Sequence, residues 1–113
     1  MQQQDDRGGF TGIINSGQWE EFNYVETKAG KIRGGHYHTE TKELFFIVDG
    51  DVEITISSLH DNQEQSFHVG KGSIIIVDVE ETHTFKSLTA SKWINALSKK
   101  MDPEIPDFHR KGA

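Results

Sequence analysis

The chain has 113 residues, enough for one domain with a real hydrophobic core but not for two. Its formal net charge is −6, from 18 acidic against 12 basic residues, which argues against nucleic acid or an anionic membrane as a partner. Cysteine is absent. Disulfides and thiolate ligands are therefore excluded, and any bound metal must be held by nitrogen and oxygen.

The first residues, MQQQDDRGG, contain no apolar stretch of the signal-peptide kind, and no apolar run approaches the length that spans a membrane. We therefore expect a cytoplasmic protein. We also expect residues 1–9 to form a flexible N-terminal segment and residues 10–113 to form a single domain.

Plentiful glycine, scarce proline and weak helical periodicity are typical of an all-β chain with many turns. Apolar runs bounded by turn residues predict nine short strands, at about residues 10–14, 19–27, 31–38, 43–48, 52–56, 65–69, 73–77, 82–88 and 92–98. The tail holds both prolines, and we expect it to be irregular. Nine short strands favour a β-sandwich or jelly roll.

Two of the predicted strands, Glu43–Val48 and Ser73–Val77, are apolar on both faces. A strand that lines a barrel needs apolar residues on its inner face only, unless its outer face is also covered. Leu44, Phe46 and Val48 would face outwards, where an exposed apolar patch usually marks an interface.

Two accounts of what covers this outer face remain open. The first is a homodimer, in which the other subunit packs against it. The second is that the N-terminal strands, with Ile13 and Ile14, cover the face within one chain.

Four residues form a candidate metal site. His36 and His38 are two apart in a predicted strand, so both imidazoles point to the same face. Glu43 begins the next strand, and His83 lies in a later one. Three imidazoles and one carboxylate suit one divalent transition metal and leave coordination positions open. Ligand type alone does not decide between Zn, Mn, Fe and Ni.

The spacing of these residues also carries a family resemblance. Gly30, His36, His38, Glu43 and Gly50 fill every position of a pattern of glycine, His-x-His, glutamate and glycine. This pattern resembles the first motif of the cupin family. The resemblance implies a double-stranded β-helix, the jelly-roll barrel of cupins, with the motif residues meeting inside it.

The second cupin motif is only partly present. Gly72 and His83 match it, whereas Asp78, Glu80 and Ser87 stand where proline, glycine and asparagine are usual in the family. The residues that differ shape a turn, while the candidate ligand is retained.

Further segments extend the resemblance, and they read Asp6-Arg7-Gly8-x-Phe10-Thr11, Arg33-Gly-x-His36-x-His38, Trp93-x-Asn95 and Asp102-Pro103-Glu104-x-Pro106-Asp107. Together they look like cupins that act on nucleotide sugars in cell-surface polysaccharide synthesis. The nearest pattern is that of the C-terminal cupin domain of bifunctional capsular polysaccharide epimerase/reductase enzymes. The dTDP-sugar 3,4-ketoisomerases and dTDP-4-keto-sugar 3,5-epimerases share Arg-Gly-x-His.

This resemblance implies an epimerase or isomerase that removes a proton next to a ketone. His36 and His38 are the candidate catalytic residues. In the ketoisomerases and 3,5-epimerases the histidine of Arg-Gly-x-His works without metal, a role that His36 would inherit, whereas Glu43 and His83 favour the metal version. The implied partner is a small molecule, a sugar nucleotide.

Three other points stay open. Arg33 either pairs with the nucleotide phosphates through its fork of donors or is a surface charge, since strict alternation from His36 would turn it outwards. Asn95 either points at the pocket or faces water. The ligand set would also serve an iron-dependent dioxygenase, and a small barrel with a metal can instead be a non-catalytic sugar- or metabolite-binding module.

Overall fold

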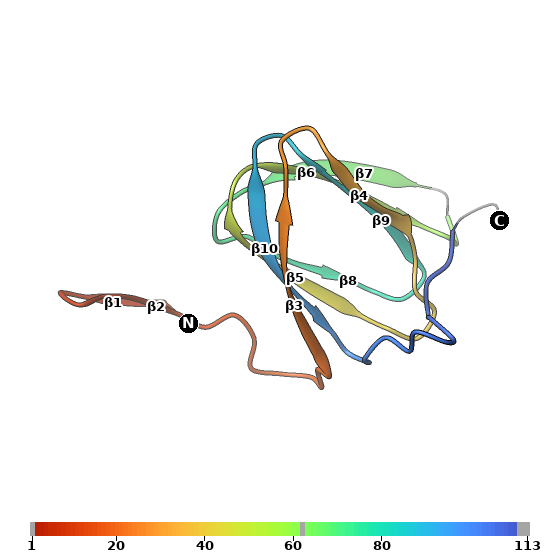
Figure 1. Cartoon of the computed structure of the whole chain (residues 1–113), viewed down its shortest axis with the longest axis horizontal. Helices are drawn as coiled ribbons and strands as arrows, with labels where there is room; N and C mark the ends of the chain where they lie inside the picture. The colour runs from red at the N-terminus through yellow and green to blue at the C-terminus, as the bar shows by residue number, and fades with distance from the viewer. Residues whose placement is uncertain (1, 62, 111–113) are drawn as a thin grey trace.

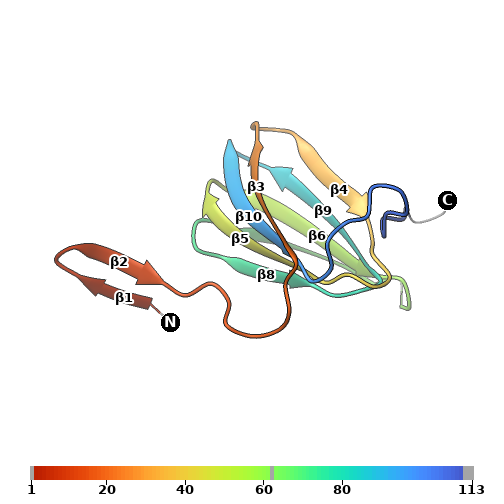
Figure 2. The same cartoon turned by 60° about the horizontal axis from the view of Figure 1, so that its bottom comes forward.

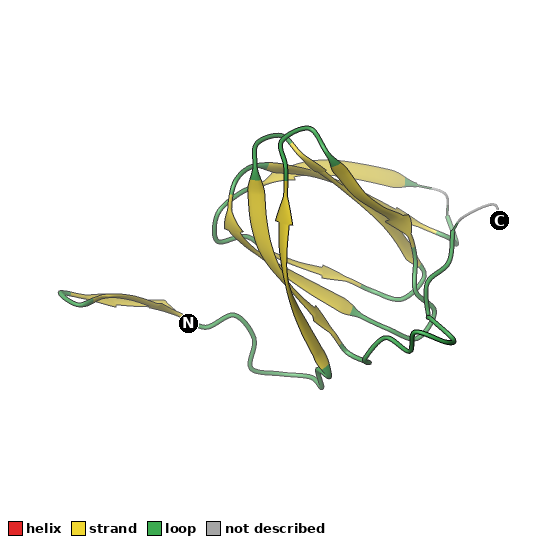
Figure 3. Cartoon of the chain, in the orientation of Figure 1, coloured by secondary structure: helices red, strands yellow, loops and turns green. Residues whose placement is uncertain are grey.

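The computed structural model describes residues 2–61 and 63–110, and this part of the chain contains strands and no helix (Figure 3). The strands are β1 (Gln2–Asp5), β2 (Gly8–Thr11), β3 (Glu21–Thr27), β4 (Ile32–His36), β5 (Glu43–Asp49), β6 (Val52–Ser58), β7 (Glu64–Val69), β8 (Ile74–Val77), β9 (Glu81–Ser87) and β10 (Ser91–Leu97). The strands predicted between residues 19 and 98 are all present, with ends that differ by one or two residues. No helix among the described residues is long and apolar enough to cross a bilayer.

Eight strands form two four-stranded antiparallel sheets that face each other as a flattened barrel (Figure 1). The first sheet has the order β3-β10-β5-β8 and the second has the order β4-β9-β6-β7. Successive strands along much of the chain switch from one sheet to the other, so residues distant in sequence become neighbours. The all-β jelly roll is therefore confirmed.

The inner faces of the two sheets bury the apolar core. Alternation along β5 sends Phe45 and Ile47 inwards, and along β6 it sends Val52 and Ile54 to meet them, because successive strand residues point to opposite faces. The core is completed by Ile75, Val77, Phe85 and Trp93. Burial of each such side chain contributes roughly 1.5–3 kcal/mol, and this core sets the spacing between the sheets.

The prediction of a strand at residues 10–14 is wrong, because the strand in this region, β2, spans Gly8–Thr11. β2 ends at Thr11 and pairs with β1 in an isolated hairpin, with Gln2 opposite Thr11. The Asp5 carboxylate accepts hydrogen bonds from the backbone and side chain of Arg7 at the turn. The hairpin stands off the barrel in both views (Figures 1 and 2), and all its residues are exposed. Such a hairpin buries no apolar face, so hydrophobic alternation does not reveal it.

The outer face of the first sheet is apolar, as predicted. Two cross-strand rows run over all four strands, and they consist of Phe22, Ala96, Leu44 and Ile76, and of Tyr24, Ile94, Phe46 and Ile74. The centre of this face is packed, since Leu44 is only 2% exposed. Its flanks are open: Phe22 is 63% exposed and Ile76 is 59% exposed.

Glu80 stands in the turn of the second cupin motif, where glycine is usual, and adopts the backbone conformation that glycine favours. Its φ of +62° lies in the left-handed region that favours glycine. The backbone N–H of Glu80 donates to the carbonyl oxygen of His38 over 2.7 Å, and His60 Nε2 lies 2.7 Å from the Glu80 carboxylate. These contacts hold the turn, which leads directly into β9 and His83.

Candidate metal centre and pocket

A bulge in β4 determines what this strand presents to the barrel interior. The pairing of β4 with β9 shifts register between Gly34 and His36, and Gly34 and Gly35 have φ values of +104° and +80°. The two glycines thus form a bulge, which locally breaks the strict alternation of side chains. As a result both Arg33 and His36 line the same cavity, although Arg33 itself is exposed.

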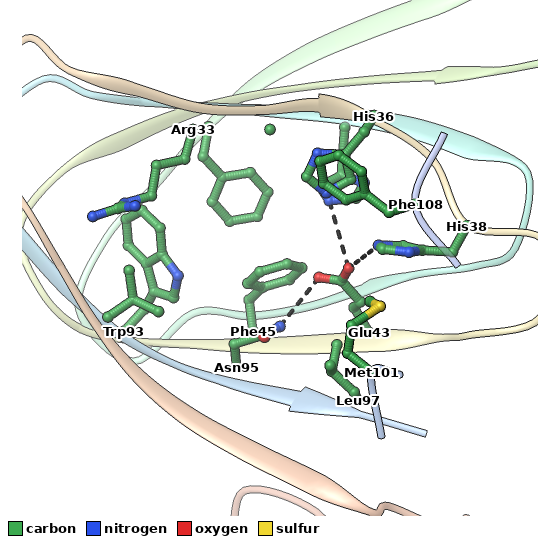
Figure 4. Close-up of a pocket in the computed structure, with 14 residues that line it drawn as sticks. Arg33, His36, His38, Glu43, Phe45, Trp93, Asn95, Leu97, Met101 and Phe108 are labelled. Carbon is green, nitrogen blue, oxygen red and sulfur yellow. Dashed lines mark hydrogen bonds and ion pairs between the residues drawn. The ribbon is translucent and has the colours of Figure 1, made fainter. Parts of the chain in front are cut away.

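The four predicted ligands lie together inside the barrel. His36 ends β4, His38 lies in the following loop, Glu43 begins β5 and His83 lies on β9. One ligand atom from each falls within 4.8 Å of the others. His38, Glu43 and His83 are buried, and His36 is half-buried. Residues from three strands of two sheets therefore converge on one point (Figure 4).

Glu43 is the centre of this cluster. Its Oε1 forms an ion pair with Nε2 of His38 and lies 3.8 Å from Nε2 of His83. Its Oε2 accepts a hydrogen bond from Nδ2 of Asn95 over 3.1 Å. Asn95 thus points at the pocket, which decides the question that the sequence left open. The carboxylate is held by contacts on both of its oxygens.

Within the cluster, the charged form is disfavoured at His36 and His83 and favoured at His38 and Glu43. Burial lowers the pKa of His36 to about 4, with neighbouring imidazoles adding to the effect, and burial also lowers the pKa of His83. Burial opposes the charged form of His38 as well, but the hydrogen bonds to Glu43 and to the Asp107 carbonyl outweigh it and raise the pKa of His38. The same His38 contact outweighs the effect of burial on Glu43 and lowers its pKa.

The residues fit a divalent cation. Three imidazoles and one carboxylate are ligands that first-row transition metals accept, and here they converge without a rearrangement of the backbone. The buried Nδ1 of His36 has no hydrogen-bond partner among the described residues. An unsatisfied buried nitrogen costs about 1–3 kcal/mol, and an imidazole nitrogen that binds a cation does not carry that cost.

A cavity of about 230 Å³ extends from the four ligands between the sheets. Apolar side chains make up much of its wall, and they include Val25, Phe45, Phe85, Trp93, Leu97 and Met101. Arg33 lies near Trp93, at the end away from His38 (Figure 4). Its Nε donates to Thr27 Oγ1 over 2.8 Å, and its Nη2 donates to the Glu26 carbonyl over 2.9 Å. A guanidinium is thus held opposite the ligand cluster.

The pocket also contains residues that the sequence did not reveal. Phe108 packs against the His36 ring with 4.2 Å between centroids, and the backbone carbonyl of Asp107 contacts His38 Nδ1. Hydrogen bonds from the loop after His38 lower the pKa of Asp107, although its burial acts in the opposite direction. The only sequence signal for this region was the resemblance of the segment around Asp102 and Asp107.

A comparison with family models identifies the chain. The model of the polysaccharide biosynthesis C-terminal domain matches residues 3–105. The chain belongs to this family. The polysaccharide biosynthesis C-terminal domain thus accounts for most of the chain, and the resemblance to cupins of polysaccharide synthesis is confirmed. No curated protein matches the chain.

Solved structures share the fold of this polysaccharide biosynthesis C-terminal domain. The capsular polysaccharide assembling protein CapF of Staphylococcus aureus is 26% identical with a TM-score of 0.77; the match covers 97% of this chain and 32% of CapF. The chain therefore spans about a third of CapF.

Two more distant structures match more completely. The dTDP-4-dehydrorhamnose 3,5-epimerase of Bacillus anthracis, with TDP and PPi bound, is 18% identical with a TM-score of 0.82, and the match covers 96% of this chain and 73% of that one. QdtA of Thermoanaerobacterium thermosaccharolyticum, a sugar 3,4-ketoisomerase in complex with TDP, is 16% identical with a TM-score of 0.82. The match covers 99% of this chain and 84% of QdtA. These structures confirm the cupin fold.

The bulge that shapes the site is open to a direct test. A Cβ added at Gly34 would overlap the carbonyl oxygen of His83, whereas one added at Gly35 would meet only Nη1 of Arg110 at 3.8 Å. We expect Gly34→Ala to lower the free energy of unfolding by more than about 2 kcal/mol, because backbone strain adds to the overlap. Gly35→Ala is the matched control and carries the strain of positive φ alone, about 1–2 kcal/mol.

Chemical denaturation of the two variants measures the difference. Equal losses of stability at Gly34 and Gly35 would contradict the close approach of β4 to His83.

Proposed function

We propose that this protein is a metal-binding nucleotide-sugar epimerase or isomerase of cell-surface polysaccharide synthesis. The observation that carries the proposal is the arrangement of one cavity, with four metal-ligand side chains at one end and Arg33 at the other. An apolar wall with a few convergent polar groups is typical of a small-molecule site. Membership of the polysaccharide biosynthesis family supports the pathway, and the named activities of the epimerase and ketoisomerase neighbours support the reaction class.

The reaction requires a base and a means of stabilising negative charge on a keto oxygen. A bound divalent metal supplies positive charge for the second task. The base takes a proton from the carbon next to the ketone, and the electron pair moves onto the keto oxygen as an enolate. Return of a proton to the opposite face of that carbon completes epimerisation, whereas return to the neighbouring carbon, with a proton shift between oxygens, completes isomerisation.

His36 is better placed than His38 to act as the base in the version of this site that works without metal. Both nitrogens of His38 are engaged, Nε2 by Glu43 and Nδ1 by the Asp107 carbonyl. His36 has a buried nitrogen without a hydrogen-bond partner among the described residues, and its ring lines the cavity. In the metal-bound version His36 and His38 serve as ligands with Glu43 and His83.

Arg33 binds the nucleotide phosphates in this proposal. Thr27 and Glu26 engage one part of its fork of donors, and the other part is available for the paired contacts that arginine makes with phosphate. The two ends of the cavity then have separate tasks: Arg33 anchors the nucleotide, and the ligand cluster holds the sugar. The TDP bound to both named neighbours is consistent with such a ligand.

Metal binding is tested by removing one ligand. We expect the wild-type protein to hold one equivalent of Zn, Mn, Fe or Ni after loading, and His38→Ala to lower the affinity by at least about 100-fold, because outer contacts alone contribute 10–100-fold. His68→Ala is the matched control, since the His68 side chain is exposed on β7 and forms an ion pair with Asp51, away from the candidate ligands. Metal analysis after dialysis gives occupancy, and circular dichroism checks the fold. Equal occupancy in His38→Ala and wild type would refute the site.

Catalysis is tested by exchange with solvent. We expect deuterium from D₂O to enter keto-sugar nucleotides, beginning with dTDP-linked 4-keto sugars, at the carbon next to the ketone. In the metal-free protein, where His36 would be the base, His36→Asn should slow this exchange by at least about 100-fold, the usual contribution of a general base, whereas His68→Asn should leave it unchanged. Mass spectrometry and NMR locate the label.

Two results of that experiment would overturn the proposed reaction. No exchange across a broad panel with the metal fully loaded would indicate a non-catalytic binding module. Oxygen consumption by the Fe(II)-loaded protein, without exchange, would indicate a dioxygenase.

We also propose that the protein is a homodimer through the outer face of the first sheet. The N-terminal hairpin stands away from the barrel (Figure 2). Ile13 and Ile14, which follow the hairpin, are half-buried, but Phe22, Tyr24, Ile74 and Ile76 remain exposed at the flanks of the two apolar rows. A two-fold interface uses each of these residues twice, so a modest patch on one chain becomes a substantial interface.

Light scattering tests the dimer. We expect the wild-type protein to have twice the mass of one chain at micromolar concentration and Ile76→Glu to be a monomer, because the interface would bury an unpaired charge. Leu88→Glu is the control, since Leu88 is 46% exposed but follows β9 in the second sheet. A monomeric wild type, or a dimer that Ile76→Glu leaves intact, would contradict the interface.

A further inference from the structure

The C-terminal segment, residues 102–110, runs along one end of the barrel (Figure 2), where Asp107 contacts His38 and Phe108 packs against His36. It contains no helix and only one bridge, in which His109 pairs with Tyr37. The backbone N–H of Tyr37 donates to the His109 carbonyl over 2.9 Å, and the reciprocal bond measures 3.0 Å. Because Tyr37 lies between His36 and His38, the segment is fastened directly to the ligand-bearing part of the chain.

Asp107 makes the densest set of contacts in the segment. Its carboxylate accepts four hydrogen bonds from the loop that joins His38 to Glu43: from the backbone and hydroxyl of Thr39, from the backbone of Glu40 and from the hydroxyl of Thr41, at 2.8–2.9 Å. One side chain therefore fixes three consecutive residues. The separation and orientation of His38 and Glu43, which this loop connects, depend on that anchor.

The backbone of Asp107 acts on His38 itself. Its carbonyl oxygen contacts Nδ1 of His38, and a carbonyl accepts but never donates, so Nδ1 carries the proton in this contact. Nε2 is then directed at Glu43. Metal-binding histidines almost always donate their second N–H to a carbonyl or carboxylate, which fixes the tautomer and the ring orientation.

Phe108, the next residue of the segment, also lines the cavity. The centroid of its ring lies 4.2 Å from that of His36, and the guanidinium carbon of Arg110 lies over the Phe108 ring, 5.8 Å from its centroid. Consecutive residues of the segment therefore restrain both histidines of the His-x-His pair. His38 is held by a hydrogen bond, and His36 is held by packing.

We infer that Asp107 is a positioning residue, which clamps the loop after His38 and orients the His38 imidazole for metal binding. This inference rests on the proposed metal site and deepens it, because it assigns part of the affinity for metal to a segment that contributes no ligand. The Asp107 carboxylate fixes the conformation of residues 39–41, and the Asp107 carbonyl fixes the orientation of the His38 ring. Loss of the carboxylate releases the loop and with it the carbonyl contact.

The test compares Asp107→Ala and Asp107→Asn with Asp102→Ala in the full chain. Asp102 is the matched control, since it lies in the same segment and its carboxylate accepts a hydrogen bond from the backbone N–H of Glu104, not from the loop after His38, among the residues that the structure describes. Competition with a chromophoric chelator gives the affinity for Zn²⁺ and Co²⁺, and urea denaturation of the metal-free proteins gives their stability. We expect Asp107→Ala to weaken metal binding 10–100-fold, as loss of an outer contact does, and Asp102→Ala to match wild type.

The metal affinity of Asp107→Asn should fall between those of Asp107→Ala and Asp102→Ala. The amide oxygen of asparagine still accepts hydrogen bonds from Thr39, whereas its NH₂ group cannot accept those from Glu40 and Thr41. A purely structural role would lower the stability of the metal-free protein and leave its affinity for metal unchanged. That result in Asp107→Ala would overturn the inference.

A second measurement keeps the inference separate from the proposed function. If the wild-type protein itself binds no metal, the proposed metal site fails, and ¹⁵N NMR of the His38 ring in the metal-free protein decides the role of Asp107. We expect a Nδ1 proton protected from exchange in wild type and in Asp102→Ala, and its loss in Asp107→Ala. An unchanged Nδ1 signal in Asp107→Ala would contradict the positioning role.

Discussion

Glu43 places a carboxylate inside the barrel among three imidazoles, and the local structure is arranged around the need to satisfy it. An isolated buried carboxylate is strongly unfavourable unless it is paired and hydrogen-bonded. Here the charge is met by His38, with His83 nearby, and the second oxygen is met by Asn95. A cluster of this kind is costly as a structural element alone, which is why its geometry favours a site that binds a cation.

The fold supplies that cluster through irregularities rather than through its regular strands. The Gly34-Gly35 bulge turns β4 so that its side chains serve the cavity, and the left-handed Glu80 directs the chain into β9. Asp107 then closes the loop between His38 and Glu43. The core strands fix the distance between the sheets, and these three features set the ligands within the space that results.

The barrel strands and the four candidate ligands could be predicted from the sequence, because both depend on the spacing of residues along the chain. The His-x-His pair, Glu43 and His83 stood at offsets that strand periodicity and the cupin pattern convert into one site, and the apolar runs located eight strands of the barrel. Alternation failed where local backbone conformation overrides it. Arg33 was left undecided, since the glycines signalled a bulge without fixing which residues it would turn inwards. The N-terminal hairpin was missed, since it has no apolar face. Asp107 was missed as a clamp, because hydrogen bonds to a loop leave no periodic signal.

The most direct test of this account is anomalous X-ray diffraction from crystals of the metal-loaded protein, recorded at the absorption edge of the metal. The account predicts a single anomalous peak inside the barrel, at bonding distance, about 2.0–2.3 Å, from His36, His38, Glu43 and His83. Absence of that peak in fully loaded crystals would contradict it, as would a metal bound to other residues or any two of the four side chains on opposite faces of their sheets.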